Sequence, residues 1–557
     1  MHTVLLINWK KAIALASALM LIFAFLSPAL AEKAVPGKIT VMIFDRGNIP
    51  GSQGDAANNR WTQWVKDNAP VEVAFVPVAR AEADQILVNL FAAGEAPDYI
   101  PYGSNPQAFV TNGMAMKVTD EMLEKVPNYL KRISNYPEVD KAASFNGIRY
   151  GFGRAENVFH NHSIVIRKDW LDNLGLSIPE TTDDLLTIAH AFTYGDPDGN
   201  GEQDTWGTSM TTDSQRIYAH MWGVPWPEKY VFDDDGSLVY VWDRIESWIG
   251  FLKALIDDGC VNPDFMLMKG DDDRVDFLNG RIGIYAQARF SQAGTGLNLY
   301  RDFKAMNPEA ELVSFALPAT EYGRYIAHIN GGVSYAGFIN PNTQNLDGVL
   351  AYVNWLMDPE VEEYLSFGPI GEYFTKNHEG TYCAIAPADV IEAELSWSPF
   401  FDAGLDLNGD EGVERFVSDQ YNQYLSASDE VSQEFGVLFY QMCCIANEPG
   451  ALEPRKWQQF LPVLPKELNL IKVTAGTAVE ELLSAALVNR SLSAGEAVAQ
   501  AHTLWEEAGG QRVDEYYAQY YATAGDTALR MIDFEAMKAT PQLTQTAQAV
   551  YERLTSE

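Results

Sequence analysis

The sequence contains few cysteines for its length. Only four of its 557 residues are cysteine, Cys260, Cys383, Cys443 and Cys444. Their spacing matches no zinc-binding or thiol-redox motif, and adjacent cysteines rarely bridge each other. A chain this long buries a large core without cross-links, so one or two structural disulfides would fit an oxidising compartment but are not required. Their pairing stays open.

Basic residues are also scarce. Lysine and arginine number 39 against 76 aspartates and glutamates, which gives a formal net charge of −37. Such a field repels phosphate backbones and anionic lipid surfaces, so we expect no nucleic acid partner and no docking on an anionic membrane. Net charge does not describe a single site, and a basic pocket inside an acidic shell stays open. The apolar content of 47% is that of a globular protein.

The signatures of common enzymes are absent. The sequence contains no Gly-x-Ser-x-Gly, no His-Glu-x-x-His, no phosphate-binding P-loop and no Gly-x-Gly-x-x-Gly after a strand. The paired carboxylates of a glycoside hydrolase are close in space rather than in sequence, so no motif can reveal or exclude them. We therefore expect no catalytic residues, and keep a secreted carbohydrate-active enzyme, a glycoside hydrolase or lyase, as the alternative.

A hydrophobic run lies near the N-terminus. Lys10 and Lys11 precede the apolar segment 12–26, and Ala29-Leu-Ala31 follows it. This order is typical of a secretory signal peptide. The alternative, an uncleaved membrane anchor, needs a longer run, and no cysteine follows for lipid attachment. We expect residues 1–31 to be a cleaved signal peptide, and the mature protein to be periplasmic without a stable membrane anchor.

Strand-like and helix-like segments alternate after residue 37. Runs of β-branched and apolar residues at 38–44, at 71–77 and from 97 are separated by helical stripes at 58–66 and 84–93. This order predicts parallel strands joined by right-handed crossovers. The first lobe is therefore of the α/β class.

A second alternating unit begins near Gly153. Its predicted elements are strands at 160–167 and 279–286, helices at 168–174 and at 183–192 with Thr182 as N-cap, a β-rich region at 320–339 and a helix at 346–357. From about residue 410 the pattern is mostly helical. No repeat or long linker separates the lobes, so we expect several chain crossings between them.

One acidic segment, 196–207, has the spacing of a calcium-binding loop. Oxygen-bearing side chains stand at loop positions 1, 3, 5 and 9, glycine stands at position 6, and position 7 coordinates through its carbonyl. The predicted metal ligands are Asp196, Asp198, Asn200, Glu202 and Asp204. Gly207 occupies the place of the usual bidentate glutamate, so the last ligand stays open. We predict a structural Ca²⁺, with an ordinary polar turn as the alternative.

Three other features are weaker candidates. Segment 406–412 resembles the start of a second calcium loop but has Glu411 at the glycine position, which favours a solvated loop. His160 and His162 have a spacing that metals use, but a hydrogen-bonded structural pair is the simpler interpretation. Trp222 and Trp226 flank a Gly-Val-Pro loop and suit stacking on sugars, with core burial as the alternative.

Seven sequence blocks occur in the order found in one protein family. They are Asn-Leu-Phe-Ala-Ala-Gly-Glu-Ala-Pro-Asp-Tyr-Ile at 89–100, Val-Pro-Asn-Tyr at 126–129, Asn-Gly-Ile-Arg-Tyr-Gly at 146–151, Arg-Lys-Asp-Trp-Leu-Asp-Asn-Leu-Gly-Leu at 167–176, Cys-Val-Asn-Pro-Asp-Phe at 260–265, Phe-Leu-Asn-Gly-Arg-Ile-Gly at 277–283, and Phe-Gly-Pro-Ile-Gly-Glu-Tyr-Phe-Thr at 367–375. With these blocks the chain resembles the extracellular solute-binding proteins of ABC importers (family 1), and within them the oligosaccharide-binding branch that includes the alginate-binding proteins. The resemblance covers roughly residues 38–380.

The resemblance implies a two-lobed α/β fold of the type II periplasmic binding protein class, with several hinge crossings and a helical C-terminal region. Lobe 1 would comprise residues 32–152 and about 320–385. Lobe 2 would comprise 153–319 and about 386–557, including the calcium loop. The implied function is a monomeric binding protein that captures an oligosaccharide or related small solute in the inter-lobe cleft and delivers it to an ABC permease and its ATPase. Chemoreception, and a peptide or organic-acid ligand, stay open.

Loops at the carboxyl ends of parallel strands line clefts of this kind. The predicted ligand-binding residues in such loops are Asp45 and Arg46 after the first strand, Tyr102 and Ser104 after the third, and Gln287 and Arg289 after the strand at 279–286. Arg154 is predicted at the hinge and Trp222 and Trp226 on the aromatic loop, and the resemblance adds Tyr373 and Phe374 from the block at 367–375. Arginines and amides would bind hydroxyls or a carboxylate, and indoles would stack. The branch commonly carries glutamate and histidine where this chain has Ile370 and Tyr373, which removes one expected acidic contact and weighs against alginate-like specificity.

Overall fold

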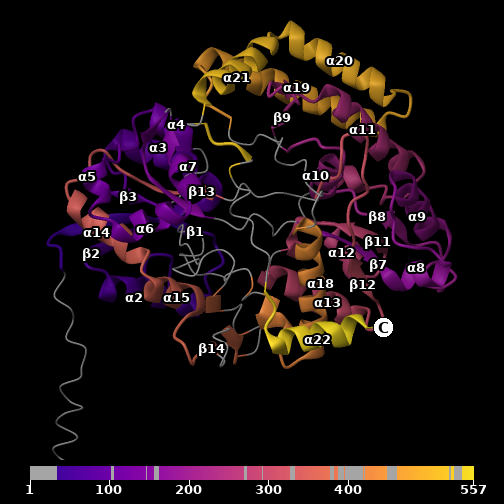
Figure 1. Cartoon of the computed structure of the whole chain (residues 1–557), viewed down its shortest axis with the longest axis horizontal. Coiled ribbons are helices and arrows are strands. Elements are labelled where there is room, and N and C mark those ends of the chain that lie inside the picture. Colours follow the sequence, from indigo (N-terminus) through magenta and orange to yellow (C-terminus); the bar gives the residue numbers. More distant parts are fainter. Residues whose placement is uncertain are drawn as a thin grey trace, which may run out of the picture.

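The computed structural model describes residues 34–101, 106–145, 147–155, 162–226, 228–268, 272–291, 293–326, 333–376, 382–386, 390, 394–395, 418, 421–447, 461–525, 528–531, 533 and 542–556. Within these ranges the chain forms two α/β lobes side by side, with a layer of helices over one end of the second (Figure 1). None of the helices in these ranges is both long enough and apolar enough to span a membrane.

The first lobe is built on a five-stranded sheet in the order β2-β1-β3-β13-β6. Its strands are β1 (Lys38–Asp45), β2 (Glu72–Ala79), β3 (Tyr99–Ile100), β6 (Phe152–Ala155) and β13 (Val333–Ile339). β1 pairs in parallel with β2 and β3, as the alternating pattern predicts, whereas β13 runs antiparallel to β3 and β6. A distant part of the chain therefore joins this sheet through β13, and β6 extends the sheet past residue 152.

Helices cover the first sheet, and two short strand pairs adjoin it. The helices are α2 (Arg60–Asn68), α3 (Ala83–Ala93), α4 (Pro106–Thr111), α5 (Asp120–Leu123), α6 (Pro127–Asn135), α7 (Pro137–Ala142), α14 (Leu346–Leu356) and α15 (Pro359–Phe367); the pairs are β4 (Ser144–Phe145) with β5 (Ile148–Arg149), and β14 (Phe374–Lys376) with β15 (Tyr382–Ala384). The Asn59 side chain starts α2 by accepting from the Trp61 and Thr62 amides. Trp64 of α2 stacks on Tyr364 of α15, with ring centroids 3.9 Å apart.

The second lobe is built on a four-stranded mixed sheet in the order β12-β7-β11-β8. Its strands are β7 (Ile164–Arg167), β8 (Trp206–Thr208), β11 (Ile282–Ala286) and β12 (Leu312–Ser314), with a separate hairpin of β9 (Tyr230–Phe232) and β10 (Leu238–Tyr240). Its helices are α8 (Lys168–Leu174), α9 (Thr182–Tyr194), α10 (Thr212–Met221), α11 (Trp242–Asp257), α12 (Arg274–Leu278), α13 (Ala293–Met306), α18 (Glu430–Asn447), α19 (Lys466–Val488), α20 (Ala494–Glu507), α21 (Gln511–Ala524) and α22 (Gln545–Thr555). The predicted strand at 279–286 is shorter than expected, because Asn279 is the C-cap of α12.

The start of α9 corrects the predicted N-cap by one residue. Thr181, not Thr182, is the N-cap, because its hydroxyl accepts from the Asp184 amide at 3.1 Å. The Asp184 carboxylate in turn accepts from the Thr181 amide at 2.9 Å, which completes a capping box. The sequence carries the signal for this choice, because Thr181 is followed three residues later by Asp184, whereas Thr182 is followed three residues later by Leu185.

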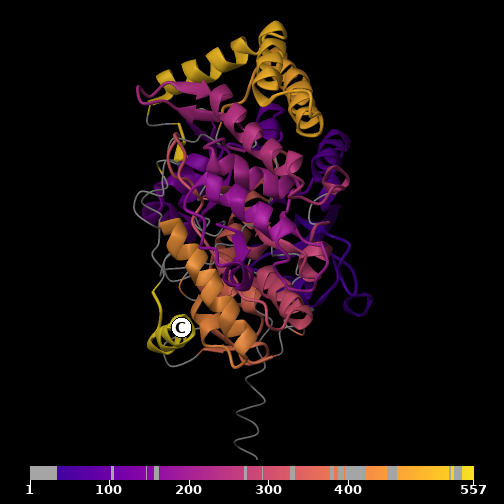
Figure 2. The same ribbon diagram turned by 90° about the vertical axis from the view of Figure 1, so that its right-hand side faces the viewer.

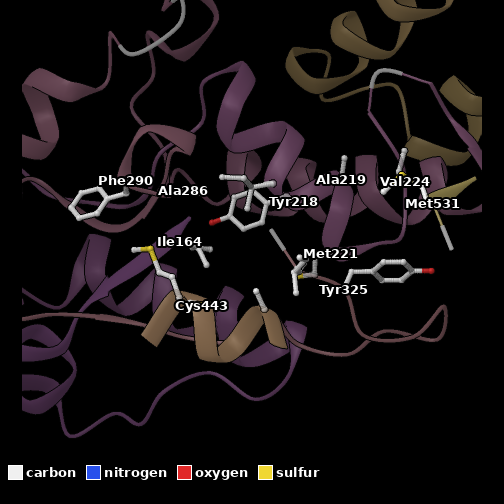
Figure 3. Packing of buried hydrophobic residues seen from close by; sticks show 14 of the residues in the cluster. Ile164, Tyr218, Ala219, Met221, Val224, Ala286, Phe290, Tyr325, Cys443 and Met531 are labelled. Atoms are coloured by element: carbon white, nitrogen blue, oxygen red, sulfur yellow. The ribbon is translucent and has the colours of Figure 1, made fainter. Parts of the chain in front are cut away.

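A continuous hydrophobic core joins the second sheet to helices from distant parts of the chain. Figure 3 shows Ile164 of β7, Tyr218 of α10, Ala286 of β11 and Cys443 of α18 within this core. All four are at most 1% exposed. α18 is therefore an integral part of the second lobe despite its distance in sequence.

Three helices, α19, α20 and α21, form a bundle against α11 and the β9–β10 hairpin, at the end of the molecule opposite α22 (Figures 1 and 2). Lys253 of α11 is 8% exposed, and its ammonium donates to the carbonyls of Ala486 and Asn489 at 2.9 and 3.1 Å. This lysine satisfies carbonyls at the C-terminal end of α19 that lack helical partners.

Candidate functional site

The predicted ligand contacts of the first lobe lie at one edge of its sheet. Asp45 ends β1, and Arg154 pairs with Ser334 of β13 beyond the end of β3, so both stand at the edge where β1 and β3 have their carboxyl ends. Asp45 is exposed and accepts from the Gly47 amide at 2.9 Å, while Arg46 and Arg154 are half-buried. The predicted contacts Tyr102 and Ser104 lie outside the described residues.

The corresponding edge of the second sheet carries a buried polar cluster. Gln287 follows β11, is fully buried, and places its amide nitrogen 3.5 Å from the carboxylate of Asp273, itself 2% exposed. The Ser209 hydroxyl, after β8, accepts from the Ala286 amide at 3.0 Å and lies 2.9 Å from the Ser214 hydroxyl. The side chain of Arg289 lies outside the described residues.

Sequence reasoning missed Ser209, Ser214 and Asp273. Ser209 and Ser214 follow β8, a strand of only three residues, Trp206–Thr208, which is too short for an alternating pattern. Asp273 precedes α12 in a run of three aspartates, 271–273, and such a run is typical of a solvated surface. A polar residue directly after a parallel strand predicts a position at the edge of the sheet. This signal would identify Ser209 only if β8 were first recognised as a strand.

The two candidate tryptophans lie in one loop between α10 and β9, as predicted, and both are half-buried. The Trp222 ring centroid is 6.1 Å from that of Phe251. Trp226 packs edge-to-face against Trp248 at 6.0 Å, and the Lys229 ammonium lies 4.8 Å from its ring centroid. Both rings thus contact protein and keep part of their surface exposed.

Tyr373 and Phe374 are largely buried within the first lobe. Arg60 of α2 donates to the Tyr373 hydroxyl at 2.5 Å, and Phe374 packs edge-to-face on Phe367 at 5.3 Å. Burial, and then hydrogen bonding to the Glu372 carboxylate, raise the pKa of Tyr373 to about 12. Most of the surface of both side chains therefore contacts protein, whereas Ile370 is 43% exposed.

In the predicted calcium loop, between α9 and β8, the glycine at position 6 makes a sharp turn, since Gly201 has a φ of 80°. Asp196 has a φ of 50°, the one positive φ outside glycine in the described ranges. Its carboxylate accepts from the Gly201 amide, with both oxygens at 3.2 Å. Burial, and then the neighbouring carboxylates of Asp204 and Asp196, help to raise the pKa of Asp198. The loop therefore concentrates negative charge. Among the described residues, the nearest basic group to its carboxylates is Arg281, whose Nε lies 4.0 Å from Asp204 Oδ2.

The side chains of this loop are not arranged for a metal as they stand. No group of three or more His, Cys, Asp or Glu in the described ranges converges on a common point. The Asn200 amide nitrogen lies between two carboxylates, at 3.0 Å from Asp198 and 3.2 Å from Asp204, and donates to both. Rotation of this amide would present its oxygen there instead, so the donor set is of the kind that Ca²⁺ prefers. Glu202 is exposed, and its amide donates to Asn200.

His162, one of the two histidines considered for metal binding, has a structural role. His162 is fully buried, and its Nε2 lies 2.7 Å from the carbonyl oxygen of Phe315. Burial and the charge of Arg324 outweigh that hydrogen bond and lower the pKa of His162 to about 4. His160 and the second acidic segment, 406–412, lie outside the described residues.

Comparison with known sequences gives one family match and several curated relatives. The model of the family "Bacterial extracellular solute-binding protein" matches residues 50–363. The chain is similar to the polygalacturonan/rhamnogalacturonan-binding protein YtcQ of Bacillus subtilis strain 168, at 26% identity over 57% of this chain and 63% of that protein. It is also similar to the fructooligosaccharide ABC transporter substrate-binding protein FusA of Streptococcus pneumoniae, at 34% identity over 31% of this chain and 36% of that protein. The chain thus spans about a third to two thirds of the curated relatives that it matches.

Solved structures with the same fold cover nearly the whole chain. FusA of S. pneumoniae in complex with kestose matches with a TM-score of 0.62 at 16% identity, over 88% of this chain and 100% of that one. The alginate-binding protein AlgQ2 without calcium ion matches with a TM-score of 0.63 at 15% identity, over 89% of this chain and 99% of that one. Similarity at this identity establishes the fold, and it confirms the two-lobed α/β architecture expected from the sequence.

Proposed function

Because this chain belongs to the bacterial extracellular solute-binding proteins, as its motifs predict, we propose that it is the substrate-binding component of an ABC importer. It captures an oligosaccharide between its lobes and delivers it to a membrane permease driven by an ATPase. The family match over residues 50–363 carries this proposal, and the two curated relatives described above, whose names state polysaccharide or oligosaccharide binding, support the ligand class.

The arrangement of polar and aromatic groups suits a carbohydrate. The first lobe offers Asp45, Arg46 and Arg154 at a strand edge, and the second offers the half-buried Trp222–Trp226 loop. Charged and amide groups bind hydroxyls, and indoles stack on the apolar faces of sugar rings. A ligand that contacts both lobes stabilises the closed state and so shifts the equilibrium between the open and closed states. The permease can then recognise the closed state as the ligand-bound form.

A binding assay with a chemical readout tests this proposal. The protein without residues 1–31 would be titrated calorimetrically with fragments of polygalacturonan, rhamnogalacturonan and alginate, with kestose, and with a peptide library. We expect one oligosaccharide bound per chain and recovered unchanged by mass spectrometry. Shortened sugar would instead favour the alternative, a glycoside hydrolase or lyase, and binding of peptides alone would contradict the ligand class.

We also propose that the loop at 196–207 holds a structural Ca²⁺. Asp196, Asp198, the Asn200 amide oxygen and Asp204 supply side-chain oxygens, Glu202 supplies its carbonyl, and water or another carboxylate completes the shell. Gathered carboxylates repel one another, and a divalent cation relieves that repulsion. The support is the spacing of the oxygen-bearing side chains and the sharp turn at Gly201, the glycine of position 6.

For the location, we propose export to the periplasm as a monomer after cleavage following Ala31. The support is the order of basic, apolar and small residues at 10–31 and the extracellular nature of the family. N-terminal sequencing of the protein recovered from a periplasmic extract tests the cleavage site, and an intact N-terminus in the membrane fraction would contradict it.

A further inference from the structure

The aromatic loop is fastened to the chain segment that runs between the two sheets. Arg244 of α11 donates from Nη1 to the carbonyl oxygen of Gly223 at 3.0 Å and to the hydroxyl of Tyr325 at 2.9 Å. Its guanidinium also lies 5.1 Å from the ring centroid of Tyr322. One half-buried arginine thus holds the loop between Trp222 and Trp226 and a second segment in a single arrangement.

The backbone of the loop at Gly223 lies in close contact with Arg244 and Tyr325. Gly223 has a φ of 68°, which side-chain-bearing residues rarely adopt. A Cβ at this position would lie 2.7 Å from Nη1 of Arg244 and 2.7 Å from the Tyr325 hydroxyl. The backbone therefore approaches the arginine and the tyrosine as closely as glycine alone permits.

Tyr325 belongs to a segment that leads from one lobe to the other. β12 ends at Ser314 in the second sheet, and β13 begins at Val333 in the first, so the chain passes from one sheet to the other after Ser314, and Tyr325 lies between these two strands in sequence. Tyr325 is 1% exposed and belongs to the same buried cluster as Val224 of the loop (Figure 3). Its hydroxyl donates to the carbonyl of Tyr322 at 3.1 Å, which leaves a lone pair to accept from Arg244.

We propose that Arg244 is a positioning residue that couples the Trp222–Trp226 loop to the inter-lobe segment through Tyr325. The inference rests on the proposed function, in which the loop contacts a captured oligosaccharide. An oligosaccharide that orders the loop would then also favour one arrangement of the segment that contains Tyr325. Closure of the two lobes would in turn hold the loop against the oligosaccharide. The loop and Tyr325 share the contacts of Arg244, so a change in the position of one changes the contacts that are available to the other.

Three variants and a control test the coupling. Arg244→Met removes the guanidinium, Tyr325→Phe removes its acceptor, and Arg244→Lys keeps a charge over Tyr322 with one hydrogen bond. Arg490→Met is the matched control, because its side chain is 74% exposed and remote from the loop in sequence. Stopped-flow tryptophan fluorescence would measure association and dissociation of the oligosaccharide identified by calorimetry.

We expect Arg244→Met and Tyr325→Phe each to release the guest about tenfold faster with little change in association, since a lost charge-assisted hydrogen bond is worth about that factor. The double variant should resemble either single variant, and Arg244→Lys should be intermediate. Additive effects of the two substitutions, or release as slow as in Arg490→Met, would overturn the proposal.

A measurement without ligand separates this inference from the proposed function. Hydrogen exchange of the peptide spanning residues 219–226 should accelerate in Tyr325→Phe, because the tie from Arg244 to the loop loses one of its two anchors. Unchanged exchange contradicts the coupling whatever the ligand is. If the wild-type chain binds no oligosaccharide at all, the proposed function fails, and the exchange result alone decides whether the tie exists.

Discussion

The buried imidazole of His162 predicts a specific loss of stability in acid. His162 is fully buried and lies 2.7 Å from the Phe315 carbonyl, and its pKa is lowered from 6.5 to about 4, chiefly by burial and secondarily by Arg324. The folded pKa is below the unfolded one, so this stabilisation is fully present above about pH 6.5 and is lost as the pH falls toward about 4.

The size of the effect follows from proton linkage. At about pH 5 the unfolded imidazole is protonated and the folded one is mostly neutral, which lowers the free energy of unfolding by ~2 kcal/mol relative to neutral pH. Urea unfolding followed by tryptophan fluorescence at about pH 7.5 and about pH 5 measures the change. Carboxylates contribute their own pH dependence, so the difference between wild type and a variant isolates the histidine.

His162→Gln is the informative variant. Glutamine stays neutral and keeps an N–H that can donate to the Phe315 carbonyl, so the variant should lose ~2 kcal/mol less than wild type between the two pH values. His190→Gln, at a side chain that is 57% exposed and lies 2.7 Å from the Asp258 carboxylate, is the control for replacing a surface histidine by glutamine. An identical loss in wild type and His162→Gln would refute the reasoning.

Three further predictions concern other sites. Adding Ca²⁺ at about a hundredfold excess over its dissociation constant should stabilise the protein by ~2.7 kcal/mol, seen as a higher melting temperature that EDTA reverses; the Asp196→Ala, Asp198→Ala double variant should not respond, and an unchanged EDTA effect in that variant would place the metal elsewhere. Glu362→Ala should destabilise the first lobe by about 3–5 kcal/mol, because Glu362 and Arg132 pair at 2.7 Å with side chains 4% and 8% exposed; an unfolding midpoint within error of wild type would show that the pair is not buried. Trp226→Ala should weaken oligosaccharide binding about tenfold or more through lost stacking while the fold is kept, as measured by calorimetry with circular dichroism as the check, and full-strength binding would remove the loop from the site.

The sequence predicts the first sheet better than the second. β1 and β2 are eight-residue strands, and α3 carries an apolar stripe, so their patterns are long enough to identify the parallel unit. β8 and β12 have three residues each, and β7 has four buried residues in a row, Ile164–Arg167. Such short or uniformly buried strands carry no alternating signal, and their mixed pairing depends on long-range contacts.

The candidate site shows the same division. Asp45, the last residue of β1, and Gln287, directly after β11, lie at the sheet edges where strand order predicts them. Tyr373 and Phe374 came from motif resemblance, and nothing local reveals that Arg60 of a distant helix contacts Tyr373. The hydrogen bonds of Arg244 to Gly223 and to Tyr325 span 21 and 81 residues of sequence, and no local pattern predicts them.

Small-angle X-ray scattering of the mature protein, with and without the oligosaccharide found by calorimetry, tests the central claim most directly. Two lobes that close around an intact ligand predict a smaller radius of gyration that saturates at one oligosaccharide per chain. An unchanged radius of gyration at saturating ligand would contradict capture by closure between the lobes.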